Sequence, residues 1–269
     1  MNLRSQAGRI RRTLLQAAFA RRAELRQCGP IVSFTFDDFP RTALTIGGSI
    51  LRNYGFYGTY YTAMSLMDTC NGLGEHFRRE DLSALLEDGH ELASHTYGHT
   101  SSRSVSCSAF TADAVKGRMA VESVAGKREA GNFAFPFGDV TLKTKREIGA
   151  KMASCRSIWG GFNGPVVDLN LLRANSLYGN QNQSDRIRKL IEQNEHRRTW
   201  LIFYSHDVQD NPSPFGCTPE LLQLAVSFAA QTAGQVLTVG DVVAELNGRT
   251  PGTNPGGSED SLPVKQTVS

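Results

Sequence analysis

Short apolar runs alternate with segments of helical period through most of this chain. The runs are rich in β-branched and aromatic residues, as buried strands are, and cover residues 31–36, 58–61, 91–94, 132–135, 155–159, 200–204 and 236–239, with a weaker one at 171–178. Amphipathic spacing and stop signals predict helices over residues 42–54, 79–88, 110–125, 141–152, 183–197, 218–232 and 241–246. In the helix over 110–125, Val115, Met119 and Val124 are expected in the core. Strands that alternate with helices predict parallel pairing with crossover helices.

The run over residues 31–36 stops at two adjacent carboxylates, Asp37 and Asp38. In α/β folds, ligands bind at the carboxyl ends of buried strands. Two carboxylates that share such a site repel each other unless a cation holds one of them. The pattern therefore favours a metal site at the end of this strand.

The run over residues 91–94 ends in a similar way, with His95 and His99 four positions apart. This spacing places two imidazoles on one side of a helical turn, a common arrangement for zinc. With Asp38 they make a three-ligand site with room for a water molecule, which is typical of catalytic centres. Asp37 is then free to act as a base on that water.

Four segments in order carry a family resemblance: Thr35-Phe36-Asp37-Asp38, Ser94-His95-Thr96-Tyr97-Gly98-His99, Phe135-Pro136-Phe137-Gly138 and Tyr204-Ser205-His206. They resemble the motifs of the polysaccharide deacetylases, also called carbohydrate esterase family 4, over residues 30–246. The resemblance, with the strand and helix order, implies an α/β fold, a single-domain distorted (β/α) barrel with about seven parallel strands. It implies a bound Zn²⁺ or another divalent transition metal.

The resemblance also implies roles for individual residues. Asp37 is expected as the catalytic base, His206 as the general acid, and the backbone N–H of Phe137 as an oxyanion donor. Asp38, His95 and His99 are expected as the metal ligands. The candidates for the substrate pocket are Pro136, Trp159 and Tyr204.

The chain departs from the family pattern at two places. The Arg that usually orients the catalytic Asp is replaced by Ala134, and we hypothesise that Arg156 or Arg173 supplies another guanidinium. Tyr204 stands where the family has a Leu that lines the acetyl pocket, which leaves a different acyl group open. Asp168 is a candidate for the Asp that supports the catalytic His, with an ordinary loop residue as the alternative.

Composition narrows the function classes. The net charge is +3, too small to indicate a nucleic-acid partner, and no apolar run approaches the length of about 20 residues that spans a membrane. The five Cys are scattered, which favours reduced thiols and a cytoplasmic location over a disulfide framework. Nothing in the sequence indicates an oligomeric state.

Both ends of the chain differ from the middle. Residues 1–28 are expected to form a basic amphipathic helix, which either packs across the bottom of the barrel or contacts a membrane surface or a partner. Residues 29–247 are expected to form the catalytic domain. Residues 248–269, rich in Gly, Pro, Ser and Thr, are expected to be a disordered tail.

These expectations imply a metal-dependent hydrolase that removes N-acetyl groups from amino sugars in an oligosaccharide, a polysaccharide or a glycan precursor. Two alternatives stay open. One is hydrolysis of another small amide or an O-acetyl ester, and the other is a catalytically silent carbohydrate-binding relative, which the loss of the Arg at Ala134 would suit.

Overall fold

The computed structural model describes residues 13–25, 29–125 and 131–248. The strands are β1 (Arg22–Glu24), β2 (Ile31–Asp37), β3 (Thr59–Thr62), β4 (Cys70–Asn71), β5 (Gly74–Glu75), β6 (Glu91–Ser94), β7 (Asn132–Ala134), β8 (Ser154–Arg156), β9 (Val166–Asp168), β10 (Asn175–Ser176), β11 (Trp200–Ser205) and β12 (Gln235–Val236). The α-helices are α2 (Ser49–Arg52), α3 (Arg79–Glu87), α4 (Cys107–Ala125), α5 (Leu142–Gly149), α6 (Ser184–Arg197), α7 (Pro219–Ala230) and α8 (Val239–Leu246). A π-helical turn, Ala43–Gly48, precedes α2, and a 3-10 turn, Pro136–Gly138, follows β7.

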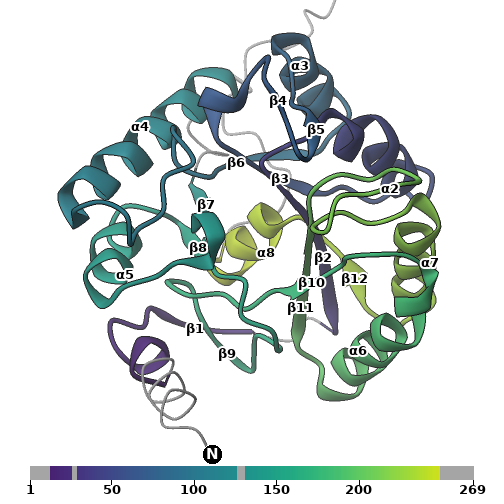
Figure 1. Ribbon diagram of the computed structural model, residues 1–269. Helices are drawn as coiled ribbons and strands as arrows, with labels where there is room; N and C mark the ends of the chain where they lie inside the picture. Colours follow the sequence, from purple (N-terminus) through teal and green to yellow (C-terminus); the bar gives the residue numbers. More distant parts are fainter. Residues whose placement is uncertain (1–12, 26–28, 126–130, 249–269) are drawn as a thin grey trace, which may run out of the picture.

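The main sheet curls into a barrel. Seven strands follow one another in the order β10-β11-β2-β3-β6-β7-β8, and each neighbouring pair is parallel. Short β12 pairs with the first residues of β2, and β3 pairs with its last residues. Figure 1 shows the larger helices around the outside, and α8, seen through the centre of this view, packs against the first residues of β2 and β11. The predicted distorted (β/α) barrel with about seven parallel strands is confirmed.

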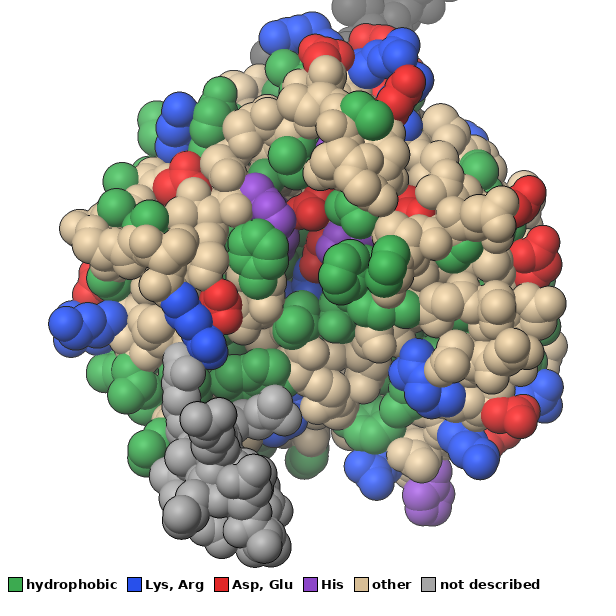
Figure 2. Space-filling model, in the orientation of Figure 1, with side chains coloured by type: hydrophobic (Ala, Val, Ile, Leu, Met, Phe, Trp, Pro, Cys, Tyr) green, Lys and Arg blue, Asp and Glu red, His purple; other side chains and the backbone are tan. Residues whose placement is uncertain are grey.

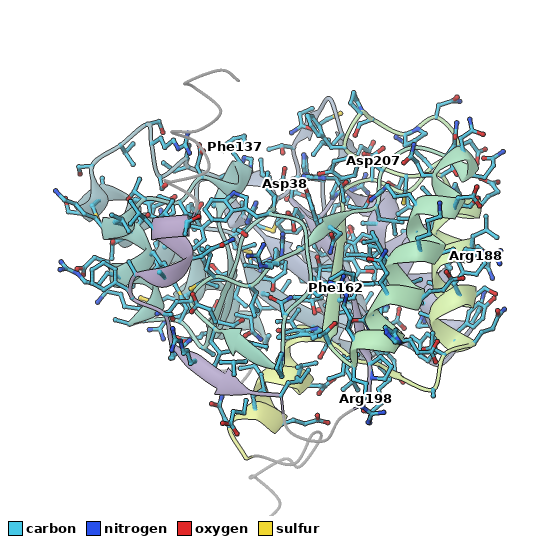
Figure 3. The ribbon with its side chains drawn as sticks, turned by 90° about the horizontal axis from the view of Figure 1, so that it is seen from below. Asp38, Phe137, Phe162, Arg188, Arg198 and Asp207 are labelled. Carbon is cyan, nitrogen blue, oxygen red and sulfur yellow. The ribbon has the colours of Figure 1, made fainter. Side chains whose placement is uncertain are left out.

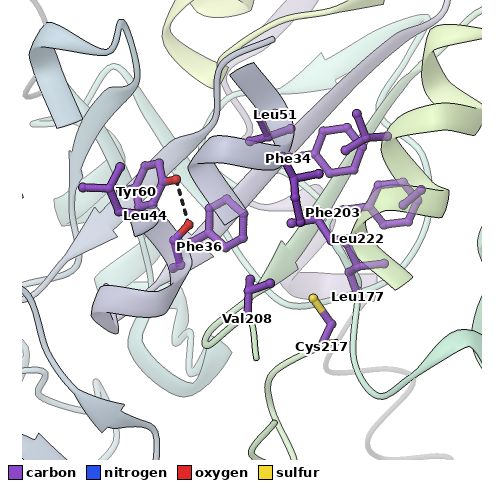
Figure 4. Close-up of a cluster of buried hydrophobic side chains, with 14 of the residues drawn as sticks. Phe34, Phe36, Leu44, Leu51, Tyr60, Leu177, Phe203, Val208, Cys217 and Leu222 are labelled. Atoms are coloured by element: carbon purple, nitrogen blue, oxygen red, sulfur yellow. Dashed lines mark hydrogen bonds between the residues drawn. The ribbon is translucent and has the colours of Figure 1, made fainter. Parts of the chain in front are cut away.

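Two apolar layers hold this barrel together. One lies between the strands and the outer helices and includes Phe34, Phe36 and Phe203, with Leu222 from α7 (Figure 4). The other fills the barrel interior, where Ile202 of β11 packs with α8 residues. Alternation along β2 and β11 sends neighbouring side chains to opposite layers, as strand geometry requires. The carboxyl ends of the strands are therefore fixed relative to one another.

The N-terminal segment packs along the wall of the barrel. Residues 13–17 are helical, and Leu15 is buried in a cluster with Phe133 and Phe135. The buried Lys145 ammonium donates to the carbonyl oxygen of Leu15 at 2.7 Å and pairs with Asp168. The helix expected over residues 1–28 does not reach residue 24, because Arg22–Glu24 pair with β9 as a strand. Residues 1–12 and 26–28 lie outside the described part.

The other sequence expectations for elements were mostly right in kind. Residues 171–178, expected as one strand, contain only the two-residue β10. The helix over 110–125 exists as α4, but the predicted core residues Met119 and Val124 are exposed. The expected tail over 248–269 lies outside the described part apart from Gly248. Among the described helices, none is long and apolar enough to cross a bilayer.

Candidate active site

The carboxyl ends of the strands surround a cavity of about 570 Å³. Its lining comprises Asp37, Asp38, Asn71, Gly72, Leu73, His95, His99, Phe137, Ile158, Tyr178, Tyr204, His206, Ser213, Pro214 and Phe215. Figure 2 shows red and purple side chains in a central hollow with hydrophobic side chains on both sides. In Figure 3, Asp38, Phe137 and Asp207 lie at one end of the barrel and Arg198 at the other. The site is therefore where parallel-barrel geometry places it.

Asp38, His95 and His99 come together in this cavity, and their potential ligand atoms lie within 4.8 Å of one another. The Nε2 atoms of His95 and His99 lie 3.5 Å and 3.0 Å from Oδ1 of Asp38. His95 is buried just after β6, and His99 follows four residues later. The helical turn expected between them is wrong, because residues 95–99 contain no helix and Thr96 and His99 have positive φ angles. The spacing argument from the sequence thus identifies three residues that converge in space.

Their hydrogen bonds suit a divalent cation. Oδ1 of Asp38 is buried without a hydrogen-bond donor in the described part of the chain. The Nδ1 of His95 lies 2.9 Å from the carbonyl oxygen of Ala134. Donation to that carbonyl leaves the lone pair on Nε2, the arrangement seen for metal-bound imidazole. Two imidazole nitrogens and one carboxylate oxygen are a ligand set that fits Zn²⁺ and similar metals.

The charges in the cluster agree with this assignment. Burial lowers the pKa of His95 to about 4, so that its imidazole is neutral near pH 7. Burial raises the pKa of Asp38, but its interaction with His99 and the nearby imidazoles of His95 and His206 outweigh burial, and the pKa lies below its usual range. The carboxylate is therefore ionised and the imidazole neutral, as metal ligands must be.

The backbone around the cluster is strained. Positive φ angles, uncommon for residues other than glycine, occur at Asp38 (62°), Phe39 (57°), Thr96 (63°), His99 (53°) and Phe137 (59°). The buried His76 supports the first of these, because its Nδ1 lies 3.1 Å from the carbonyl oxygen of Asp38. Such strain persists only where the surrounding structure enforces it, and it is frequent at functional sites.

Asp37 pairs with a guanidinium from the other side of the barrel. Nη2 of Arg156, on β8, donates to Oδ1 of Asp37, and both side chains are buried. Burial alone would lower the pKa of Arg156, but the negative charge of Asp37 is the main opposing effect, and the pKa of Arg156 lies above its usual value. Arg173 instead donates to the carbonyl oxygen of Gly160. Of the two arginines considered from the sequence, the one that contacts Asp37 is Arg156.

His206 faces the cluster from the end of β11. Its Nε2 lies 4.0 Å from Oδ2 of Asp38, and its Nδ1 lies 3.1 Å from the carbonyl oxygen of Phe215. The loop that carries Phe215 is fastened by buried Asp207, which accepts from the backbone N–H of Ser213 at 2.8 Å. The loop therefore holds the outer nitrogen of His206 and leaves the inner one toward the cavity.

The remaining sequence candidates lie in different places. Phe137 is at the cavity rim, 60% exposed, with its ring 4.6 Å from that of His99. Tyr204 lines the cavity, whereas Pro136 and Trp159 are not among the lining residues. Trp159 packs against the apolar cluster of Phe110 and Phe135 on the outer side of the sheet.

Asp168, considered as support for the catalytic His, lies elsewhere. It pairs with Lys145 at 2.7 Å and accepts from the backbone N–H of Arg21 at 3.0 Å. The contact with Arg21, together with the hydrogen bond from Lys145 to the carbonyl oxygen of Leu15, fastens the N-terminal segment to the wall of the barrel. We therefore find no role for Asp168 beside His206, and its carboxylate serves the packing of the first described residues.

The sequence patterns give no signal for several residues in or beside the cavity. Tyr178, Phe215 and residues of the β4–β5 hairpin line it, and His76 contacts the carbonyl oxygen of Asp38. Phe215 and Leu73 carry apolar side chains in loops, a signal that the sequence offers only weakly. The aromatic rings of Tyr178 and Phe215 lie 6.1 Å apart and flank His206.

Comparison with known proteins agrees with this geometry. Residues 25–153 match the family model described as polysaccharide deacetylase. No curated protein matches the chain. Among solved structures, the chitin deacetylase from the fungal pathogen Colletotrichum lindemuthianum is 16% identical with a TM-score of 0.53, covering 84% of this chain and 90% of that chain.

Two bacterial structures are similar to the same degree. A family 4 acetyl xylan esterase from Clostridium thermocellum, in complex with a cobalt ion, is 17% identical with a TM-score of 0.52, covering 81% of this chain and 92% of its own. The D285S mutant of the peptidoglycan deacetylase PdaC from Bacillus subtilis is 16% identical with a TM-score of 0.51, covering 82% and 92%. At these identities the structures show a shared fold. The match to the polysaccharide deacetylase model, over residues 25–153, includes Asp37, Asp38, His95, His99 and Phe137.

Proposed function

We propose that this protein is a metal-dependent hydrolase that removes N-acetyl groups from amino sugars in an oligosaccharide, a polysaccharide or a glycan precursor. The observation that carries the proposal is the buried Oδ1 of Asp38, which has no hydrogen-bond donor among the residues that the structure describes and faces the Nε2 atoms of two histidines. An ionised oxygen in that position is costly unless a cation binds it. Asp38, His95 and His99 would hold that cation, with Zn²⁺ as the first candidate.

A metal held there supplies Lewis-acid polarisation of the acetyl carbonyl and acidifies water. Asp37, ion-paired with Arg156, is the group beside this centre that can take a proton from the attacking water. His206 donates a proton to the nitrogen as the carbon–nitrogen bond breaks, so that acetate and a free amine leave. An amine is a poor leaving group without that proton, which gives His206 a clear task in amide hydrolysis.

The turn that carries Phe137 supports its proposed role as an oxyanion donor. Its N–H lies at the start of a 3-10 turn, where no carbonyl of the turn itself can accept it. The carbonyl oxygen of Ala134, just before the turn, accepts from His95. A backbone donor in a constrained turn is pre-organised to bind the negative oxygen of a tetrahedral intermediate.

The walls of the cavity suit a sugar. Aromatic rings of Phe137, Tyr178 and Phe215 surround the polar centre, and among the described residues none that lines the cavity is Lys or Arg. Pyranose rings present apolar C–H faces that pack on aromatic rings. We therefore propose an uncharged N-acetylated sugar unit as the group that enters. The cytoplasmic location stays a prediction.

The test is acetate release from N-acetylated oligosaccharides by the full chain as purified, after chelation, and after Zn²⁺ is restored. We expect release that stops with the chelator and returns with the metal. Metal bound at one equivalent without release from any N-acetyl or O-acetyl sugar would reject the proposed activity. Release that the chelator does not affect would reject the role of the metal.

A further inference from the structure

The side chain that orients Asp37 is itself held by two aromatic rings. We propose that Tyr61 and Tyr204 are positioning residues that clamp the guanidinium of Arg156, so that Tyr204 acts on catalysis through Arg156 and Asp37. The inference rests on the proposed hydrolase function. It assigns to Tyr204 a task other than contact with the acyl group.

The register of the sheet explains how Arg156 reaches this place. Ala134 of β7 and Arg156 of β8 are paired neighbours, so their side chains project to the same side of the sheet. Ala134, Ala93 and Tyr61 form a small buried cluster there. Two alanine methyl groups leave interior volume, and the long side chain of Arg156 occupies the same region over the ring of Tyr61. A guanidinium has thus been supplied by the strand next to the one that carries Ala134.

Hydrogen bonds alone do not fix this guanidinium. Nη2 of Arg156 donates to Asp37, and Nη1 donates to the carbonyl oxygen of Ser157 at 3.2 Å. Its Nε is buried without a hydrogen-bond partner among the described residues. A buried cation that is only partly hydrogen-bonded needs another source of stabilisation.

Two aromatic rings supply this additional stabilisation of the Arg156 guanidinium. The central carbon of the guanidinium lies 4.6 Å from the centroid of the Tyr61 ring and 5.3 Å from that of the Tyr204 ring. Both distances lie within the range for attraction between a cation and an aromatic face. The ring of Tyr204 is supported by Tyr178, whose ring meets it edge-on at 5.4 Å. Hydrogen bonds hold the Arg156 guanidinium at its two Nη atoms, and the two rings restrict its position further.

The position of the tyrosines relative to Asp37 supports the same conclusion. Tyr61 is the paired neighbour of Asp37 in the β2–β3 register. Tyr204, on β11, reaches the guanidinium from the other neighbour of β2. Strands on both sides of β2 therefore contribute a ring, and Arg156 crosses from β8 to meet them. A Leu at position 204 would have no face to offer the cation.

A double-mutant cycle tests whether Tyr204 acts through Arg156. The variants are Tyr204→Leu, Tyr204→Phe, Arg156→Met and the pair Tyr204→Leu with Arg156→Met, assayed with Zn²⁺ on N-acetyl and N-propionyl sugars. We expect Arg156→Met to lower kcat about 100-fold, within the range for impaired base catalysis. Tyr204→Leu is expected to lower kcat about tenfold on both substrates with KM within about twofold, whereas Tyr204→Phe keeps most of kcat.

The decisive comparison is the effect of Tyr204→Leu on kcat in the wild type and in the Arg156→Met variant. If Tyr204 acts through Arg156, Tyr204→Leu adds no more than about a twofold loss once Arg156 is Met. A full tenfold loss in the Arg156→Met background would overturn the inference. So would a Tyr204→Leu variant that mainly changes the preference between acetyl and propionyl, since that result would place Tyr204 in the acyl pocket.

A second measurement needs no turnover. In protein labelled with ¹⁵N-arginine, hindered rotation of Arg156 should give separate Nη signals that are absent from Arg156→Met. Tyr204→Leu should speed their exchange, and Tyr204→Phe should not. Unchanged exchange in Tyr204→Leu would reject the clamp even if the enzyme is active. If the wild type releases no acetate, the proposed function fails, and this measurement still decides the clamp.

Discussion

The imidazole of His95 is held by the backbone of Ala134, whose carbonyl oxygen lies 2.9 Å from its Nδ1. The residue that lacks the expected Arg side chain thus still orients a metal-ligand candidate through its main chain. Side-chain identity at position 134 and the orientation of His95 are therefore independent. This separation allows the guanidinium to come from Arg156 without disturbing the cluster.

Asp38→Asn should abolish tight metal binding. A carboxamide lacks the negative charge that balances the cation, so affinity should fall by more than the about 100-fold that loss of an outer-shell partner can cost. Titration with Zn²⁺ against a competing chelator measures this directly. Asp88→Asn is the matched control, because Asp88 pairs with Arg52 on the surface. Equal affinity in Asp38→Asn and the wild type would remove Asp38 from the ligand set.

His206→Ala should distinguish amide from ester chemistry. Loss of a general acid costs about 10² to 10⁴ in rate where the leaving group needs a proton, and an alkoxide leaving group needs it less than an amine. We expect kcat on an N-acetyl sugar to fall at least 100-fold and kcat on an O-acetyl sugar to fall much less. A loss of only a few-fold on the N-acetyl sugar would contradict the acid role.

Sequence patterns predicted the strands, most helices and the convergence of Asp38, His95 and His99, because these depend on local periodicity and on residues at strand ends. The sequence patterns gave wrong predictions where the packing of elements against one another decides which residues are buried. The buried residues of α4 are Phe110, Ala114, Gly117 and Val121, and a Cβ on Gly117 would lie 2.4 Å from the backbone carbonyl carbon of Thr96. Close approach of the helix to this backbone therefore selects the face with Ala114 and Gly117 for burial and leaves Met119 exposed.

The alternation of side chains after β8 explains why Trp159, expected in the substrate pocket, does not line the cavity. Arg156 points into the barrel, and two residues later Ile158 lines the cavity, whereas Trp159 packs on the outer side. Extending that period from Arg156 would have indicated Ile158 as the wall residue. The contact between Arg156 and Asp37 joins residues 119 positions apart, which periodicity cannot reveal.

Stability should fall in mild acid partly because of His90. Burial lowers its pKa to about 4 from 6.5, so between these values the unfolded chain binds a proton that the folded chain does not. The free energy of unfolding should therefore decrease as the pH falls from about 6.5 to 4, by about 3 kcal/mol at most from this group. The measurement is urea unfolding across this range.

His90→Asn is the variant for that experiment, since its side-chain oxygen can accept the N–H of Gly58 that His90 Nδ1 accepts at 3.0 Å. The comparison is between slopes against pH, because lost packing lowers stability at every pH. His196→Asn, on the last turn of α6, is the control. An unchanged slope in His90→Asn would mean that His90 is not the group responsible.

Phe215→Ala should weaken substrate binding more than catalysis. The ring is 54% exposed at the mouth of the cavity and lies 5.8 Å from that of His206. Loss of one aromatic contact should raise KM about threefold to tenfold, and kcat should change less. Phe19→Ala removes a similarly exposed ring from the N-terminal segment and serves as the control. Equal KM values for both variants and the wild type would show that the sugar does not stack on Phe215.

Returning the guanidinium to position 134 should restore part of the activity that Arg156→Ala removes. Because the two positions are paired neighbours on β7 and β8, an Arg at 134 projects to the same side as Arg156. We expect Ala134→Arg with Arg156→Ala to turn over at least about tenfold faster than Arg156→Ala alone.

Two further variants make that test strict. Ala134→Lys with Arg156→Ala should recover less, because an ammonium lacks the planar fork that pairs with a carboxylate. Ala134→Arg alone should lower the melting temperature, since it would bring a second cation into a buried region that already holds Arg156. If Ala134→Arg with Arg156→Ala folds but turns over no faster than Arg156→Ala alone, Asp37 needs its partner on β8. The idea that either β7 or β8 can supply the guanidinium would then be wrong.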